Sequence, residues 1–257
     1  MGVVLATVAA LIAFAANSLL CRAALGGLEA DAASFTAVRL ASGALMLLAV
    51  SRSRGRGGSW TSAAALFAYA AAFSFAYFFL PAGIGALLLF GAVQVTMIGV
   101  GIAGGERPPP AVWGGLVLAL AGLAHLSLRG RKTRGAPILA TADNFLRALP
   151  FAALLWAIGA VARTPHLSAR GAGLAVASGA ITSGLGYVAW YSALPRLTAS
   201  RAAVLQLCVP VLAAIGGVVL LGEVLTVRLI VAGAAILAGI ALATGASRPA
   251  PARPSNA

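Results

Sequence analysis

The side chains whose types and spacing could do chemistry are polar and aromatic residues embedded in long apolar stretches. Ser183, Tyr187 and Tyr191 recur every four residues in "AITSGLGYVAWYSAL", so a helix would place them on one face with Trp190 beside them. Polar groups at membrane depth are costly unless they face protein or a water-filled path. This face is therefore a candidate for a solute pathway, with close packing as the alternative for Tyr187 and an interfacial aromatic belt as the alternative for Trp190 and Tyr191.

Amides add to this polar set, because Asn17, Gln94 and Gln206 lie in three different apolar stretches. Each buried amide needs hydrogen-bond partners. With Tyr77 they are candidates for lining a polar cavity near the membrane midplane, and interhelical hydrogen bonding is the alternative. Tyr77 belongs to a second stripe with four-residue spacing, for which core packing is favoured: Tyr69, Phe73 and Tyr77.

Two arginines lie near expected helix starts, Arg39 in "AVRLASGAL" and Arg147 in "FLRALPFAAL". A guanidinium in such a place can snorkel to the membrane interface or bind helix-end carbonyls. Anchoring is favoured for both over a role in the pathway.

The sequence offers no suitable set of residues for catalytic, redox or metal chemistry. His125 and His166 have no second metal ligand at helical spacing, and Cys21 and Cys208 form no metal or redox motif. No Ser–His or paired-Asp set lies at membrane depth. We expect neither an enzyme nor a metal or cofactor, and no midmembrane carboxylate to relay protons, because all five acids fall at or beyond the ends of apolar stretches: Glu29, Asp31, Glu106, Asp143 and Glu223.

Composition defines the elements that must position these groups. The 257 residues are 61% hydrophobic and 9% charged, with a mean hydropathy of +1.00, which predicts an all-α, multi-pass membrane protein. The net charge of +13 comes from cations between apolar stretches, without interleaved aromatics on one face, so no nucleic acid is expected as a partner. The bias toward Arg, Ala and Gly is typical of a GC-rich bacterial genome and hence of a bacterial inner membrane.

A hydrocarbon core about 30 Å thick needs roughly 20 apolar residues as helix. Nine such segments are expected, followed by a disordered tail at 246–257. The segments are 3–21, 33–51, 61–80, 83–104, 110–128, 144–162, 171–194, 201–221 and 227–245. Within the seventh, Ala175, Gly179 and Ser183 form a small-residue seam that predicts close helix packing.

An internal repeat is visible when the chain is compared with itself at an offset of 117 residues. Gly105–Glu106 then falls on Gly222–Glu223, and "LAGLA" at 120–124 falls on "LAGIA" at 237–241. After a gap, Arg147 becomes the counterpart of Arg39. Internal repeats are the usual construction of secondary transporters.

These residues resemble the drug/metabolite transporter superfamily and its EamA-type domain. The likeness includes "FAANSLLCRAAL" in the first span, Arg39 in the second, the aromatic third span and the Gly-Glu close of the fourth. The resemblance implies ten spans in two inverted copies of five around a central substrate path. It also implies that a small molecule is moved across the lipid bilayer, in the outward direction.

The chain departs from that pattern because the family's sixth span is missing. We expect a first repeat of five segments at 1–128, a basic cytoplasmic loop at 129–143 and a shortened second repeat of four segments at 144–245. The loop contains Arg129, Arg131, Lys132 and Arg134.

Loop charges decide between two topologies under the positive-inside rule. With the amino terminus inside and nine crossings, seven loop cations lie inside and nine outside. If the basic loop faces the cytoplasm, twelve lie inside and four outside. We expect the second arrangement, in which segment 110–128 does not cross or inserts only marginally; nine packed helices are the alternative.

The expected function is a membrane transporter that exports a small organic metabolite, amino acid or drug-like solute. A degenerate or interaction-only membrane protein is the alternative, because of the missing span, and an intramembrane enzyme is a weaker one. A homodimer is left open.

Overall fold

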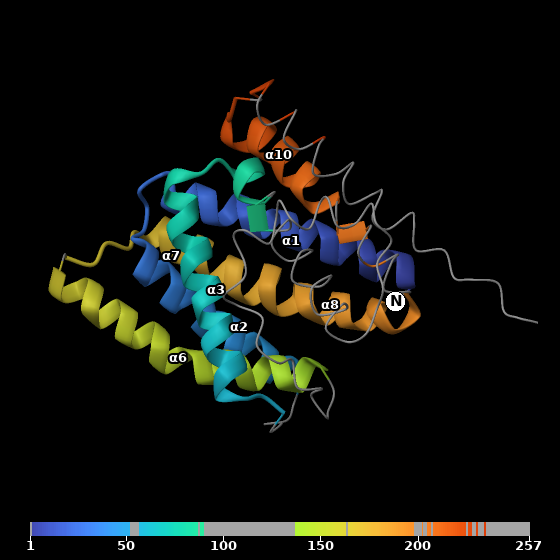
Figure 1. Cartoon of the computed structure of the whole chain (residues 1–257), viewed down its shortest axis with the longest axis horizontal. Coiled ribbons are helices and arrows are strands. Elements are labelled where there is room, and N and C mark those ends of the chain that lie inside the picture. The colour runs from blue at the N-terminus through green and yellow to red at the C-terminus, as the bar shows by residue number, and fades with distance from the viewer. Residues whose placement is uncertain are drawn as a thin grey trace, which may run out of the picture.

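In the part of the chain that the computed structural model describes, the secondary-structure elements are helices, joined by loops that form one isolated β-bridge between Ala30 and Leu167 (Figure 1). The described residues are 2–51, 57–86, 88–89, 137–162, 164–197, 202, 205–206, 208–224, 226–227, 230 and 234. Within them, five helical stretches are long and apolar enough to cross a membrane. The protein is therefore an all-helical, multi-pass membrane protein, as the composition predicts.

The bounds follow the apolar stretches. The helices are α1 (Val3–Leu25), α2 (Ala32–Ser51), α3 (Trp60–Phe79), α6 (Pro137–Ala162), α7 (Ala169–Val176), α8 (Gly186–Ala193) and α10 (Cys208–Leu221). A π-helix, η1 (Ala177–Leu185), joins α7 to α8, and a 3₁₀ turn, η2 (Leu194–Arg196), follows α8. Together α7, η1, α8 and η2 form one membrane-length stretch from Ala169 to Arg196. We call it the α7–α8 helix.

One end of the bundle, which we call the far end, is defined by contacts where α1 and α3 finish. Ser168, just before α7, donates to the Glu29 carboxylate at 2.6 Å, and the Asp31 amide donates to the His166 carbonyl at 2.8 Å. Arg22, near the end of α1, donates to the carbonyl of Tyr77 at the end of α3. The ends of α1, α3 and α6 and the starts of α2 and α7 therefore meet here.

The opposite end, which we call the amino-terminal end, contains the starts of α1 and α3. The Gly58 amide, just before α3, donates to Asp143 in the first third of α6 at 3.0 Å. Thr141 of α6 hydrogen-bonds Tyr191 near the end of α8 at 3.2 Å. Consequently α1, α3 and α6 run from the amino-terminal end to the far end, whereas α2 and the α7–α8 helix run back.

The direction of α6 constrains the path of the chain before it. Helical residues 82–86 begin at the far end, where the Ala82 amide donates to Glu223. Pro137 begins α6 at the amino-terminal end. These two described points therefore lie at opposite ends of the bundle. Residues 129–134 lie outside the described residues, and their predicted position on the side of the amino terminus stays a prediction.

The observed bounds differ from the expected ones at α6 and in the seventh segment. α6 begins at Pro137 instead of residue 144, because proline suits the first turn of a helix and Thr141 bonds back to the Pro137 carbonyl at 2.8 Å. Hydropathy could not reveal that nine residues of the seventh segment are π-helical. Segments 83–104 (beyond its first turns), 110–128 and most of 227–245 lie outside the described residues.

Small residues let α2 approach the α7–α8 helix closely, as the predicted seam indicates. Gly179 of η1 leaves no room for a Cβ beside the Arg39 carbonyl of α2, and Gly43 of α2 lies against Phe145 and the Gly179 carbonyl. Ala175 is fully buried. On the outer edges, α6 packs on α2 and α3, and α10 packs on α1 (Figure 1).

Asp31 caps the amino terminus of α2. Its carboxylate accepts from the Ser34 amide at 2.8 Å and from the His166 amide at 2.9 Å. Burial alone would raise the pKa of Asp31, but these hydrogen bonds outweigh it and hold the pKa below its usual value. The carboxylate therefore stabilises both the helix start and the loop that leads to α7.

Asp31→Ala should lower stability at neutral pH by about 1 kcal/mol, as the loss of a helix cap does. Because the folded-state pKa is depressed, the stabilisation is complete above the unfolded value of about 4 and is lost as pH falls through the folded value. Melting curves of both proteins in detergent should differ at pH 7 and converge at low pH. A gap that stays constant down to low pH would contradict this role.

Candidate functional site

A polar cluster lies between α1, α2 and η1 in the interior of the bundle. Every member is buried, with an exposed fraction of 7% or less. We call it the central cluster, and its members are Asn17 and Cys21 of α1, Arg39 of α2, and Ser178 and Thr182 of η1. Polar groups this deep in a membrane helix bundle mark candidate solute sites.

Asn17 holds the cluster together as a shared acceptor. Its side-chain oxygen accepts from Ser178 Oγ at 2.7 Å and lies 3.2 Å from Thr182 Oγ1. The thiol of Cys21, one turn further along α1, lies 3.8 Å from Ser178 Oγ. The π-helical winding of η1 presents Ser178 and Thr182 together, and π-helical turns are frequent at functional sites.

Arg39 brings a positive charge into the cluster. Its NH1 nitrogen lies 3.8 Å from Cys21 Sγ, its guanidinium carbon lies 4.9 Å from the centroid of the Phe73 ring, and it also interacts with the Tyr69 hydroxyl. Only 4% of the residue is exposed. The anchoring interpretation does not fit this position, because the side chain turns inward between α1 and α3 instead of reaching the interface.

No carboxylate among the described residues pairs with Arg39. Each of the four described acids has its hydrogen-bond and ion-pair partners at an end of the bundle, and Glu106 lies outside the described residues. The four acids are Glu29, Asp31, Asp143 and Glu223. Among the described residues, the cation is thus in contact with a thiol, a hydroxyl and an aromatic face.

An aromatic group lies toward the amino-terminal end of the same interior. The rings of Tyr187 and Tyr191 stack at 5.9 Å, and Phe14 of α1 lies 5.9 Å from Tyr187 and 6.0 Å from Trp190. Phe145 of α6 meets Tyr187 edge-on at 6.3 Å. The structure therefore brings together the three aromatic residues predicted on the seventh segment.

The remaining predicted residues are spread more widely. Ser183 is buried on η1, and Tyr77 is fully buried at the far end, 4.6 Å from the Phe73 ring. Gln206 is half-buried, and its side-chain oxygen accepts no hydrogen bond from the described residues. Gln94 lies outside the described residues. The predicted convergence of Tyr77, Tyr187 and the two glutamines on one space stays a prediction, and Tyr77 and Tyr187 pack in different clusters.

Arg147 differs from its proposed counterpart Arg39. It pairs with Asp143 at 3.0 Å on the surface of α6, and its guanidinium carbon lies 5.4 Å from the centroid of Trp60, the first residue of α3. This is the position expected of a helix-anchoring cation near a membrane interface.

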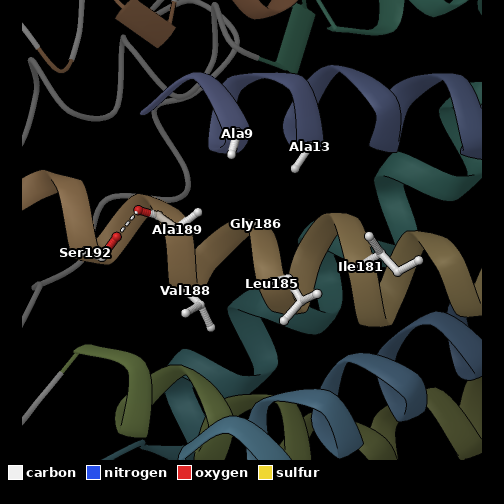
Figure 2. Close-up of a pocket in the computed structure, with 8 residues that line it drawn as sticks. All are labelled: Ala9, Ala13, Ile181, Leu185, Gly186, Val188, Ala189 and Ser192. Atoms are coloured by element: carbon white, nitrogen blue, oxygen red, sulfur yellow. Dashed lines mark hydrogen bonds between the residues drawn. The ribbon is translucent and has the colours of Figure 1, made fainter. Parts of the chain in front are cut away.

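An apolar groove of about 350 Å³ runs along the outside of α1 and the α7–α8 helix. Figure 2 shows its lining, which is formed by Ala9, Ala13, Ile181, Leu185, Gly186, Val188, Ala189 and Ser192. Its hydroxyl, from Ser192, already donates to the Ala189 carbonyl at 2.7 Å. The groove offers alkyl surface but no polar group to orient a solute, so the candidate site is the central cluster.

Comparison with known proteins bears on the family of this chain and leaves its site residues as a proposal. The model of the EamA-like transporter family matches residues 135–245. The uncharacterized protein PA1977 of Pseudomonas aeruginosa is 51% identical over 270 aligned positions, which cover 93% of each chain. The chain belongs to the EamA-like transporter family. No solved structure matches it.

Membership in the EamA-like family confirms the resemblance to drug/metabolite transporters. The family match starts just before α6 and includes the α7–α8 helix and α10, so it contains Ser178, Thr182 and the predicted aromatic face. Asn17, Cys21 and Arg39 lie in the half of the chain before the match. The central cluster is therefore built by both halves.

Sequence reasoning missed three members of this cluster. Ser178 and Thr182 have the same four-residue spacing as Ser183, Tyr187 and Tyr191, but they are small hydroxyl residues, which commonly pack helices. Cys21 was considered as a metal or redox residue and set aside. All three residues face Arg39 or its neighbours, and this shared position would have identified them. It depends on the packing of segments more than 100 residues apart in the sequence.

Proposed function

We propose that the protein exports a small organic solute across the bacterial inner membrane, and that the central cluster and the neighbouring aromatic group line its path. The observation that carries this proposal is the buried polar cluster between the two halves. A bundle that only anchors a protein in lipid has no need of a buried cation and three hydroxyl- or amide-bearing side chains at its centre.

We further propose that the halves are inverted repeats. The matched segments run in opposite directions: α2 against α6, α3 against the α7–α8 helix, and the helix that begins at Ala82 against α10. The contacts follow the same relation. α2 packs on η1, and α3 packs on α6, so replacing each segment by its counterpart turns the first contact into the second. Alternating access through such repeats is the usual mechanism of secondary transporters.

A chain shortened by about one span is compatible with the length of the alignment with the Pseudomonas aeruginosa protein. The alignment extends over 270 positions, although 93% of 257 residues is about 240, so gaps of about 30 positions fall in this chain. About 30 residues are enough for one membrane span and its loop. With one span lost, α6 can begin at the amino-terminal end only if segment 110–128 does not cross the membrane, as the loop charges predict.

Sidedness follows from the positive-inside rule. The connection between α2 and α3 at the amino-terminal end contains Arg52, Arg54 and Arg56, and the basic cluster directly precedes α6. We therefore place the amino-terminal end in the cytoplasm.

Transport is tested by producing the full chain in a bacterial host and profiling small molecules in the medium by mass spectrometry. Cells with the wild-type chain should release at least one organic solute severalfold more than cells without it. Asn17→Leu, which leaves Ser178 without its acceptor, should reduce this release at equal abundance in the membrane, and Ser192→Ala in the outer groove should not. Identical media in all cases would favour the non-transporting alternative.

A further inference from the structure

We infer that the transported solute is an organic monoanion with a carboxylate, which Arg39 recognises inside the bundle. This inference rests on the proposed transport function and names its substrate class. It starts from the positive charge of Arg39, for which the described residues provide no carboxylate partner. An uncompensated arginine at membrane depth is costly, so its retention calls for a partner.

The candidates for that partner within the chain are few. The sequence has only five carboxylate side chains, and four of them are engaged at the ends of the bundle. Neither Cys21 nor Tyr69 is an ordinary counter-ion near neutral pH, because free thiols and phenols ionise at about 8.5 and 10. The remaining acid, Glu106, gives the competing explanation, and the experiment below addresses it.

The geometry around Arg39 suits an anion with an apolar body. One NH1 contact goes to the weak acceptor Cys21 Sγ, and the guanidinium lies over the Phe73 ring, so the strong donors of its planar fork meet no carboxylate among the described residues. Tyr69 lies one turn before Phe73 on α3, with ring centroids 5.8 Å apart. Aromatic faces beside the fork would hold an apolar or aromatic substituent.

The number of charges favours a carboxylate over a phosphate. One arginine and one carboxylate form a neutral pair, whereas a phosphate monoester carries about −1.5 to −2 at pH 7 and would leave net negative charge in the membrane interior. The central cluster contains no second cation.

The binding test uses the purified full-length protein in detergent with matched probes: 3-phenylpropionate, the neutral 3-phenylpropionamide and phenyl phosphate. Quenching of tryptophan fluorescence reports binding, since Trp190 belongs to the adjacent aromatic group. We expect the carboxylate to bind at least about tenfold more tightly than the amide, a difference of about 1.4 kcal/mol. Arg39→Gln should abolish this preference, and Arg147→Gln, which removes an arginine paired with Asp143, should keep it.

Stability of the protein without ligand separates substrate recognition from an internal ion pair. Arg39→Met should raise the melting temperature or leave it unchanged, because it removes a buried charge that lacks a fixed partner. If Glu106 were that partner, Arg39→Met would lower the melting temperature and Glu106→Gln would lower it as well, and the inference would be overturned.

The other outcomes are equally decisive. Equal binding of amide and carboxylate, tighter binding of phenyl phosphate, or no binding of the carboxylate would overturn the inference. Export of a neutral solute without carboxylate binding would reject the substrate class and leave the transport function standing. Carboxylate binding without export of any solute would reject the transport function instead.

Discussion

Gly179→Ala is expected to destabilise the bundle by about 1–3 kcal/mol or more and to abolish transport. A Cβ at this position would overlap the Arg39 carbonyl oxygen and lie 2.8 Å from its carbonyl carbon, so the α2 backbone itself would have to move. Any such shift also displaces Arg39 from Cys21 and separates Ser178 from Asn17. Melting temperature in detergent and solute release from cells report the two effects.

A second glycine of the same membrane-length stretch provides the matched control. A Cβ at Gly173 in α7 would meet no atom within 4 Å. Gly173→Ala should therefore be neutral or stabilising by up to about 1 kcal/mol, because alanine is the better helix former. If both substitutions had the same effect, the close contact between α2 and η1 would not be the cause.

Glu223→Gln is expected to weaken the far end of the bundle, where one carboxylate joins three segments. Glu223 accepts from Arg22 Nε at 3.2 Å and from the Ala82 amide at 2.9 and 3.0 Å, which caps the helix that begins there. Arg22 in turn donates to the carbonyls of Tyr77 and Phe78 at the end of α3. Loss of the negative charge leaves this half-buried guanidinium without its ion pair.

A double-mutant cycle measures this effect. Arg22→Gln and Glu223→Gln together should cost less than the sum of the single changes, with a coupling of about 0.5–3 kcal/mol. Glu29→Gln is the comparison, because its partner Arg170 is 72% exposed and exposed ion pairs contribute at most about 1 kcal/mol. Additive effects of Arg22→Gln and Glu223→Gln would contradict direct coupling.

Gly222 shows why a Gly-Glu pair closes α10. Its φ of +67° lies in the left-handed region that glycine adopts without strain, and the turn directs Glu223 back toward Arg22 and Ala82. The repeat places Gly105–Glu106 at the equivalent point of the first half, outside the described residues. In the described half, the Gly-Glu pair of the sequence repeat is thus explained by the left-handed turn at Gly222 and by the contacts of Glu223.

Hydropathy and charge were sufficient to predict several features of the fold. They predict the membrane class, the ends of α1 to α3 to within a few residues, and the close-packed seam at Ala175 and Gly179. These features depend on local composition and spacing. The count of loop cations also predicts that α6 starts on the side of the amino terminus. Pro137, the first residue of α6, lies at that end.

The interior site was less accessible to sequence reasoning. Whether Arg39 snorkels or turns inward depends on Cys21, Phe73 and Tyr69, which come from other helices. No local pattern in residues 177–185 predicts the π-helical winding that presents Ser178 beside Thr182. Neither feature leaves a periodic signature in the sequence.

The claim that the two halves cross the membrane in opposite directions is tested most directly by cysteine accessibility in intact cells. In a background with Cys21→Ser and Cys208→Ser, single cysteines replace Gly2, Pro137 and Thr164, which are all exposed. A membrane-impermeant thiol reagent should label Thr164→Cys from outside, and Gly2→Cys and Pro137→Cys only after permeabilisation. Labelling of Pro137→Cys from outside while Gly2→Cys stays protected would contradict the inverted arrangement.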